Sequence, residues 1–133
     1  MKPDLEDQTL FADQLRAYRE QADPEKRSTV EAAIWERFGE EGAVFVLDMS
    51  GFSRLSEKHG LILYLSRIHR MQGCVRPLIE DHGGQVVKYL ADNAFALFPQ
   101  VEQAIETAID INRLLNEENE KTQEAFDIEV SCG

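Results

Sequence analysis

Residues 43–54, AVFVLDMSGFSR, begin with an unbroken apolar run from Ala43 to Leu47 and turn polar at Asp48. A short continuous run of this kind is typical of a buried central strand. We expect the strand to end at Asp48, where a serine and a glycine follow closely. The stretch therefore predicts a buried strand that leads through a short loop into a helix.

The residues after this strand predict a long helix, two strands, a second helix and a final strand. Apolar residues at helical spacing, among them Leu61 and Leu65, extend to Ile79. Pro77 is expected to kink this helix, and the glycines at 83–84 are expected to end it. Two strands are expected next, from Gln85 to Leu90 and from Ala94 to Phe98, joined by a turn at Asp92-Asn93. A helix from Val101 to about Glu118 and a strand from Phe126 to Val130 are expected to follow. This β-α-β-β-α-β order indicates an α+β protein with a ferredoxin-like split βαβ core.

The first 42 residues have a different pattern and predict a helical extension. They are rich in charge, and their apolar residues recur at helical spacing on both sides of Pro24. Ser28 followed by Glu31 resembles a capping box that would open the second helix. We therefore expect an N-terminal helical extension over residues 1–42 and a domain over residues 43–133.

The predicted topology brings two acidic residues together. A right-handed crossover makes the first two strands of the core parallel, with the third between them. The end of the first strand, at Asp48, then lies beside the turn that contains Asp92. Two close carboxylates repel each other unless a proton or a cation intervenes, and oxygen ligands suit Mg²⁺ or Mn²⁺. The loop after Asp48 could also direct backbone amides at a phosphate. The alternative is structural: Asp48 as a helix cap and Asp92 as a turn residue.

Composition excludes several partners. The chain has 133 residues, with 14 Lys and Arg against 25 Asp and Glu, a formal net charge of -11. Nucleic acids and anionic membrane surfaces both require a positive surface, so neither is expected as a partner. No apolar run approaches the roughly 20 residues that span a bilayer. Cys74 and Cys132 do not suggest a disulfide framework, and we expect a cytoplasmic protein.

Two motifs resemble the hallmarks of class III adenylate and guanylate cyclase domains. The first is AVFVLDMSGFSR at 43–54; the second is GGQVVKYLADNAFALF at 83–98. The resemblance implies that Asp48 and Asp92 hold two catalytic metal ions, Mg²⁺ or Mn²⁺. It implies that Lys88 recognises the base, where adenylate cyclases tend to have Lys and guanylate cyclases Glu. It also assigns triphosphate binding to the segment Met49, Ser50, Gly51, Phe52 and Ser53.

The resemblance implies an enzyme that converts ATP to 3′,5′-cyclic AMP and pyrophosphate, with GTP the less favoured substrate. In this family the site lies between two subunits, which implies a homodimer in which Lys88 serves the partner's metal pair. The alternative for Lys88 is a solvated strand residue. The alternative for the whole domain is a catalytically silent module for dimerisation or nucleotide sensing.

The chain departs from the family pattern in two respects. Ala91 replaces the glycine that usually precedes the second aspartate, and Asn93 follows it. The family's transition-state Asn and Arg come after the strand that ends here at Gly133. Since an Arg that stabilises developing phosphate charge supplies a large share of the rate, we expect these residues alone to cyclise ATP poorly or not at all.

Overall fold

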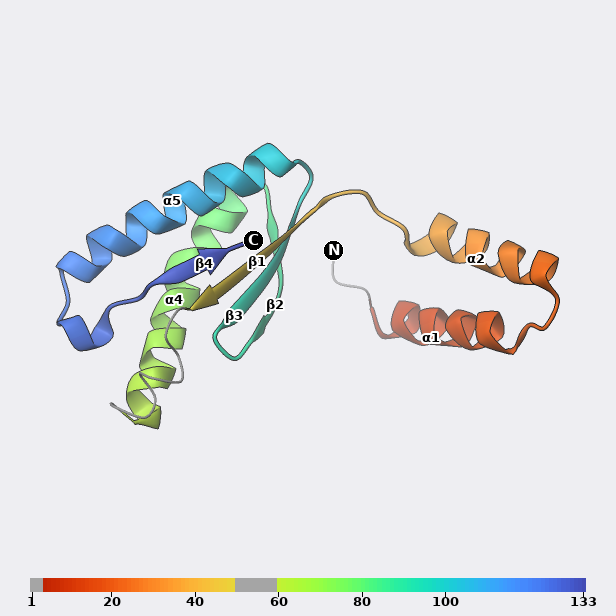
Figure 1. Cartoon of the computed structure of the whole chain (residues 1–133), viewed down its shortest axis with the longest axis horizontal. Helices are drawn as coiled ribbons and strands as arrows, with labels where there is room; N and C mark the ends of the chain where they lie inside the picture. Colours follow the sequence, from red (N-terminus) through yellow and green to blue (C-terminus); the bar gives the residue numbers. More distant parts are fainter. Residues whose placement is uncertain (1–3, 50–59) are drawn as a thin grey trace. The chain divides into compact units, whose positions relative to one another are not determined.

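The computed structural model describes residues 4–49 and 60–133 (Figure 1). The chain divides into two units, Met1–Glu41 and Gly42–Gly133. The first unit contains helices only, whereas the second is built on a four-stranded sheet.

The first unit is a hairpin of two helices, α1 (Leu5–Glu20) and α2 (Pro24–Phe38). The carboxylate of Asp4 caps α1 by accepting from the Asp7 amide at 2.7 Å. The second helix begins at Pro24, and Asp23 caps it by accepting from the Glu25 amide. The prediction that Ser28 opens α2 is therefore wrong. Proline fits the first turn of a helix because its missing N–H is not needed there, so Pro24 starts α2 one turn earlier.

A few contacts at the ends of the helices hold the hairpin together. At its open end, Arg37 pairs with Asp7 at 3.1 Å, and the rings of Phe11 and Phe38 meet edge to face with centroids 5.0 Å apart. At the loop end, the guanidinium of Arg27 donates two hydrogen bonds to the carbonyl of Gln21. Neither helix contains a buried residue.

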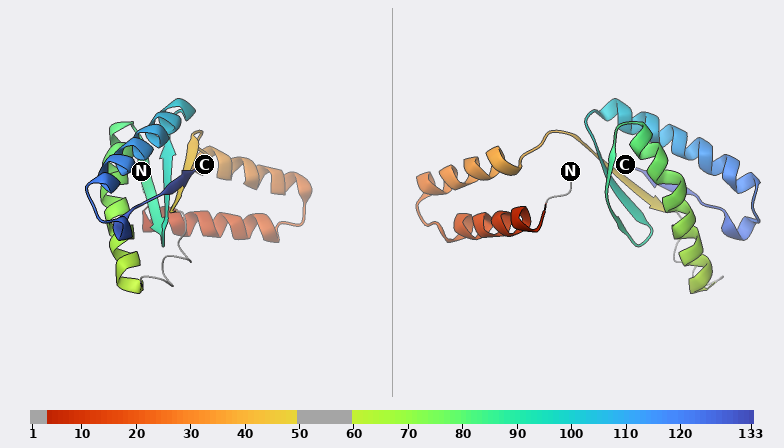
Figure 2. Two further views of the ribbon diagram at one scale, coloured as in Figure 1. Left: turned by 60° about the vertical axis from the view of Figure 1, so that its left-hand side comes forward. Right: turned by 180° about the vertical axis from the view of Figure 1, so that it is seen from behind.

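The second unit has a sheet of strand order β2-β3-β1-β4, with every neighbouring pair antiparallel. The strands are β1 (Ala43–Met49), β2 (Gln85–Leu90), β3 (Asn93–Phe98) and β4 (Val130–Cys132). Strands β1 and β2 are thus parallel to each other with β3 between them, which confirms the ferredoxin-like topology. Helices α4 (Leu61–Asp81) and α5 (Val101–Glu120) lie on the same face of this sheet (Figure 2).

The core lies between this face and the two helices. Alternate residues of β1 and β3 point into it, and Leu47 and Phe98 are completely or almost completely buried. Helices α4 and α5 contribute residues at helical spacing, chiefly Met71, Val75, Ile79, Ile111 and Leu115. No helix from the described residues of this unit lies on the opposite face of the sheet.

The first two turns of α4 differ from the prediction. Leu61 and Leu65 were expected to face inward, but their side chains are 64% and 48% exposed. Tyr64 and Arg67 are buried in their place. Burial lowers the pKa of Arg67, and the nearby charge of Asp127 partly offsets this shift. The C-terminal turns follow the predicted pattern, and the helix continues through Pro77 to Asp81.

The last strand also differs from the prediction of Phe126 to Val130. Residues Glu124–Phe126 form a short 3₁₀ helix, η1, and the strand runs from Val130 to Cys132. Asn119 of α5 replaces a sheet neighbour here, because its side-chain amide donates to the carbonyl of Ile128 and its oxygen accepts from the Ile128 amide, both at 2.9 Å. The guanidinium of Arg70 in α4 donates a further hydrogen bond, to the carbonyl of Phe126, at 3.2 Å.

None of the described helices is both long enough and apolar enough to cross a membrane.

Candidate functional site

The candidate site lies at the end of β1 beside the β2–β3 hairpin. Asp48 lies inside β1, not after it, and pairs in register with Asn93 of β3. One residue further on, the amide of Met49 donates to the carbonyl of Asp92 at 3.2 Å. The topology therefore brings Asp48 and Asp92 together as the sequence predicted, although the strand continues two residues beyond Leu47.

The two carboxyl groups interact directly. Partial burial raises the pKa of the Asp92 carboxyl, a hydrogen bond from its own amide lowers it, and the charge of Asp48 together with a hydrogen bond between the two carboxyls raises it further. Two carboxylates in contact are stable only if a proton or a cation is shared between them. The pair therefore has the electrostatic character of a cation site.

Tyr64 is a further member of this site that the sequence did not indicate. It lies in the first turn of α4, and its side chain is almost completely buried. Burial raises the pKa of its hydroxyl, and the charges of Asp92 and Asp48 raise it further. Tyr64 thus stays protonated and adds no negative charge beside the two carboxylates. Periodicity missed it because the adjacent Leu65 was the more apolar choice for the inward face.

The turn that holds Asp92 has an unusual backbone. Its central residues are Ala91 and Asp92, and Asn93 belongs to β3, where it pairs with Leu90. Asp-Asn is therefore not the turn, contrary to the prediction. Ala91 has a φ of 52°, in the left-handed region where glycine is favoured, as at the first central residue of a type II′ hairpin turn. A glycine at position 91 would adopt this φ without strain.

Gly83 and Gly84, directly before β2, allow the β2–β3 hairpin to pack closely. Gly83 has a φ of 85° and ends α4 as expected. A Cβ on Gly84 would collide with the ring of Phe98. Gly84 therefore allows β2 to start directly beside the buried end of β3.

The donor set suits a divalent cation that also binds phosphate oxygens. No cluster of three or more His, Cys, Asp or Glu side chains that would hold a metal occurs in residues 4–49 and 60–133. The available protein ligands are two carboxylates, and Mg²⁺ is typically bound by one or two carboxylates together with water and substrate phosphates. The side-chain oxygen of Asn93 is buried beside the pair and accepts no hydrogen bond from any described residue. Asp48 and Asp92 therefore fit Mg²⁺ or Mn²⁺ better than a zinc site, which requires more protein ligands.

Lys88 lies on the same sheet but away from the carboxylates. It pairs with Phe95, and its ammonium group lies 5.4 Å from the centre of that ring. Phe95 pairs with Val46 of β1, so Asp48 is two strands away from Lys88 and two residues further along the strand. By standard strand spacing, about 12 Å separates the Cα atoms of Lys88 and Asp48. Lys88 therefore does not belong to the cluster formed by Asp48 and Asp92.

Asp48 and Lys88 both belong to the uncovered face of the sheet. The buried residues of β1 alternate with Val44, Val46 and Asp48, which therefore point away from the helices. Val44 is 67% exposed, and Leu90 is also exposed. This open face thus combines an apolar surface with the charged residues of the candidate site. Of the segment assigned to the triphosphate, Met49 is buried in β1, and Ser50, Gly51, Phe52 and Ser53 lie outside the described residues.

Solved structures of nucleotide cyclases share this fold. One structure of a bacterial light-regulated adenylyl cyclase matches with a TM-score of 0.63 and 24% identity, over 68% of this chain and 50% of that one. A second structure with the same description has a TM-score of 0.63 and 19% identity, over 86% of this chain and 44% of the other. The guanylyl cyclase Cya2 matches with a TM-score of 0.58 and 20% identity, over 68% of this chain and 50% of that chain.

No family model matches the sequence. No curated protein shows a significant sequence match. The chain spans about half the length of the cyclase structures that it resembles. The fold is that of a nucleotide cyclase, an α+β protein with a ferredoxin-like core.

Proposed function

We propose that this chain contains part of the catalytic domain of a class III nucleotide cyclase, which converts ATP to 3′,5′-cyclic AMP and pyrophosphate. The observation that supports this proposal most directly is that the sheet brings Asp48 and Asp92 together, through the Asp48–Asn93 register and the hydrogen bond from the Met49 amide to the Asp92 carbonyl. The fold shared with adenylyl and guanylyl cyclases supports it independently.

In this proposal Asp48 and Asp92 hold two divalent cations, Mg²⁺ or Mn²⁺. When bound, these ions would lower the pKa of the ribose 3′-hydroxyl and offset the charge of the phosphates. The protein contributes the position of the carboxylates, which the Asp48–Asn93 register and the bond from the Met49 amide to the Asp92 carbonyl fix relative to each other. Tyr64, kept neutral, supports the pair without competing for the cations. The segment 49–53 is proposed to bind the triphosphate.

We further propose that Lys88 recognises adenine across a homodimer interface. An ammonium group donates hydrogen bonds and suits the N1 acceptor of adenine, whereas the corresponding edge of guanine presents donors. Its separation from Asp48 favours a nucleotide held by the carboxylates of a second copy. The open face that carries Lys88 is apolar enough to be an interface, with Val44 and Leu90 exposed.

Metal-dependent nucleotide binding tests the catalytic part of this proposal. We expect ATP with Mn²⁺ to raise the melting temperature of the chain more than ATP alone, because ligands that bind only the native state stabilise it. Asp92→Asn should lose the Mn²⁺-dependent part of this shift. Asp81→Asn is the matched control, since Asp81 is exposed at the far end of α4, and it should respond as the wild type does.

Two further comparisons sharpen this test. ATP should stabilise the chain more than GTP, and Lys88→Glu should reduce or reverse that preference. Equal melting temperatures with and without Mn²⁺-ATP, in the wild type and in Asp92→Asn alike, would contradict the enzyme and favour the catalytically silent module.

A further inference from the structure

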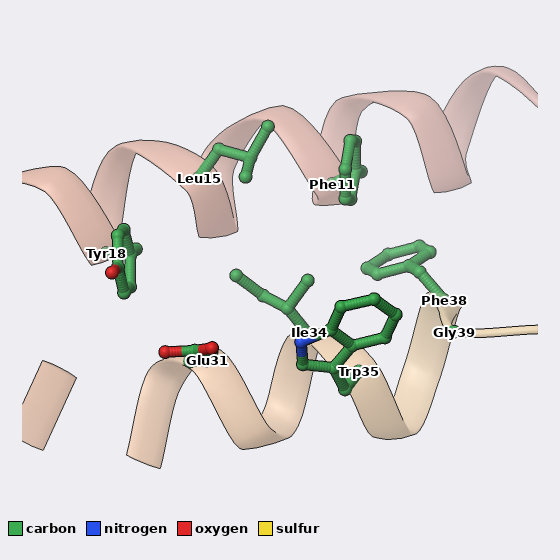
Figure 3. A pocket seen from close by; sticks show the side chains of 8 residues that line it. All are labelled: Phe11, Leu15, Tyr18, Glu31, Ile34, Trp35, Phe38 and Gly39. Carbon is green, nitrogen blue, oxygen red and sulfur yellow. The ribbon is translucent and has the colours of Figure 1, made fainter. Parts of the chain in front are cut away.

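The hairpin of α1 and α2 has an apolar groove along one side. Phe11, Leu15 and Tyr18 of α1 face Ile34, Trp35 and Phe38 of α2 across a hollow of about 410 Å³ (Figure 3). Trp35 is 68% exposed and Leu15 43% exposed, so solvent reaches both walls. Large aromatic and aliphatic side chains gathered in this way on a surface mark an interaction site.

Most of the large exposed hydrophobic side chains of the hairpin line this groove. Its stripes follow helical spacing: residues 11, 15 and 18 on one helix and residues 34, 35 and 38 on the other. No residue of either helix is buried. A segment of about 40 residues that buries so little surface normally requires a metal, a disulfide or association with another chain. The described part of the hairpin contains no cysteine, and no cluster of metal-ligating side chains occurs there.

Charges beside the groove indicate what covers it. Arg19 follows Leu15 by one helical turn and continues the row of Phe11 and Leu15, whereas Glu31 lines the groove on α2. Neither forms an ion pair with another described residue. Arg27 stacks over the ring of Tyr18, and Phe11 meets Phe38, which fixes the register of the two helices. In this register Arg19 lies within about one helical turn of the level of Glu31.

We propose that the groove binds the same groove of a second copy of this chain, forming an antiparallel four-helix bundle. A two-fold axis parallel to the helices places α1 of one copy against α2 of the other, at the same level. Arg19 of each copy then faces Glu31 of its partner, and the two apolar stripes close over each other. Four-helix bundles of two hairpins pack in this way, with the apolar positions inside. This interface is separate from the open face of the sheet and does not depend on cyclase activity.

Trp35 provides a direct readout, because it is the only tryptophan of the chain. We expect the whole chain to associate in sedimentation equilibrium, and the Trp35 emission to shift to shorter wavelength as dimers form. Leu15→Glu places a charge in the groove and should weaken dimerisation at least about tenfold, with Trp35 emission that stays at the longer wavelength. Leu5→Glu is the matched control, since Leu5 is 80% exposed and does not line the groove. Helix content measured by circular dichroism should be the same in both variants.

A charge exchange tests the arrangement within the bundle. Arg19→Glu and Glu31→Arg should each weaken dimerisation, and the double variant should restore it, because the pair is re-formed with opposite polarity. Val44→Glu separates this interface from the one proposed on the sheet, since it should leave the concentration dependence of Trp35 emission unchanged. Emission that does not vary with concentration, Leu15→Glu dimerising as tightly as Leu5→Glu, or additive losses in the charge pair would each overturn the proposal.

Discussion

The two units of this chain contain helices of similar length, yet only one of them has a core. Every fully buried hydrophobic side chain among the described residues belongs to the second unit, where α4 and α5 pack on the sheet. In the hairpin, α1 packs against α2, and neither helix contains a buried residue. The difference shows that an amphipathic pattern specifies which face of a helix is to be buried. The surface that covers this face must be supplied by another element, such as the sheet under α4 and α5.

Truncation of one leucine in each unit should give the largest contrast. Leu47→Ala removes a fully buried side chain from the centre of the sheet and should lower the free energy of unfolding by about 3 kcal/mol. Leu15→Ala, in the hairpin groove, should cost about 1 kcal/mol or less when the chain is monomeric. Urea denaturation followed by circular dichroism measures both. Equal losses would show that the hairpin has a core of its own.

A hydrogen bond that joins two elements should matter more than one within a single helix. Asn119→Ala leaves the amide and carbonyl of Ile128 without their partners and should cost about 2 kcal/mol, with faster hydrogen exchange at Ile128. Thr9→Ala in α1 removes an exposed bond to the carbonyl of Leu5 and should be close to neutral. A neutral Asn119→Ala would mean that Ile128 is held by its apolar contacts alone.

Glycine should have opposite effects in the two units. Ala91→Gly relieves the positive φ of the β2–β3 turn and should stabilise the second unit by about 0.5 to 1 kcal/mol. Ala32→Gly, at an exposed position inside α2, should destabilise the hairpin by about 1 kcal/mol. Thermal unfolding of both variants distinguishes the signs, and a loss in Ala91→Gly would contradict the strained turn.

The smallest effect is expected at the carboxylate pair without metal. The pKa of Asp92 is raised in the folded chain, so the protonated carboxyl favours the folded state and its ionisation opposes folding. The stability that protonated Asp92 contributes is therefore lost as the pH rises through the folded pKa. Asp92→Asn should match the wild type in acid, where Asp92 is protonated, and exceed it near neutral pH by about 0.5 kcal/mol, the size of one partly exposed charge interaction. Asp13→Asn in α1 is the control, because Asp13 pairs with Arg16 at 3.6 Å and no gain is expected there. A metal-free Asp92→Asn that is less stable than the wild type at neutral pH would show that the pair does not repel.

The sequence by itself determined the order of the elements and the meeting of Asp48 and Asp92. Local patterns were sufficient because a strand, a crossover helix and a hairpin can combine in one sheet in very few ways. The apolar spacing of the C-terminal turns of α4 and the glycine at the end of that helix likewise gave correct boundaries. Lys88 was correctly placed in β2, although its role stays a proposal.

The tertiary structure alone decided which side chains of α4 face inward near the site, and where the last strand begins. Tyr64 and Arg67 are buried there, and the charges that shift their pKa values belong to Asp92, Asp48 and Asp127, which are distant in sequence. The final strand starts at Val130 because Asn119 satisfies the backbone of Ile128 in place of a neighbouring strand. At the final strand, a polar contact between Asn119 and Ile128 overrides the local strand preference, since a buried backbone group without a partner is costly.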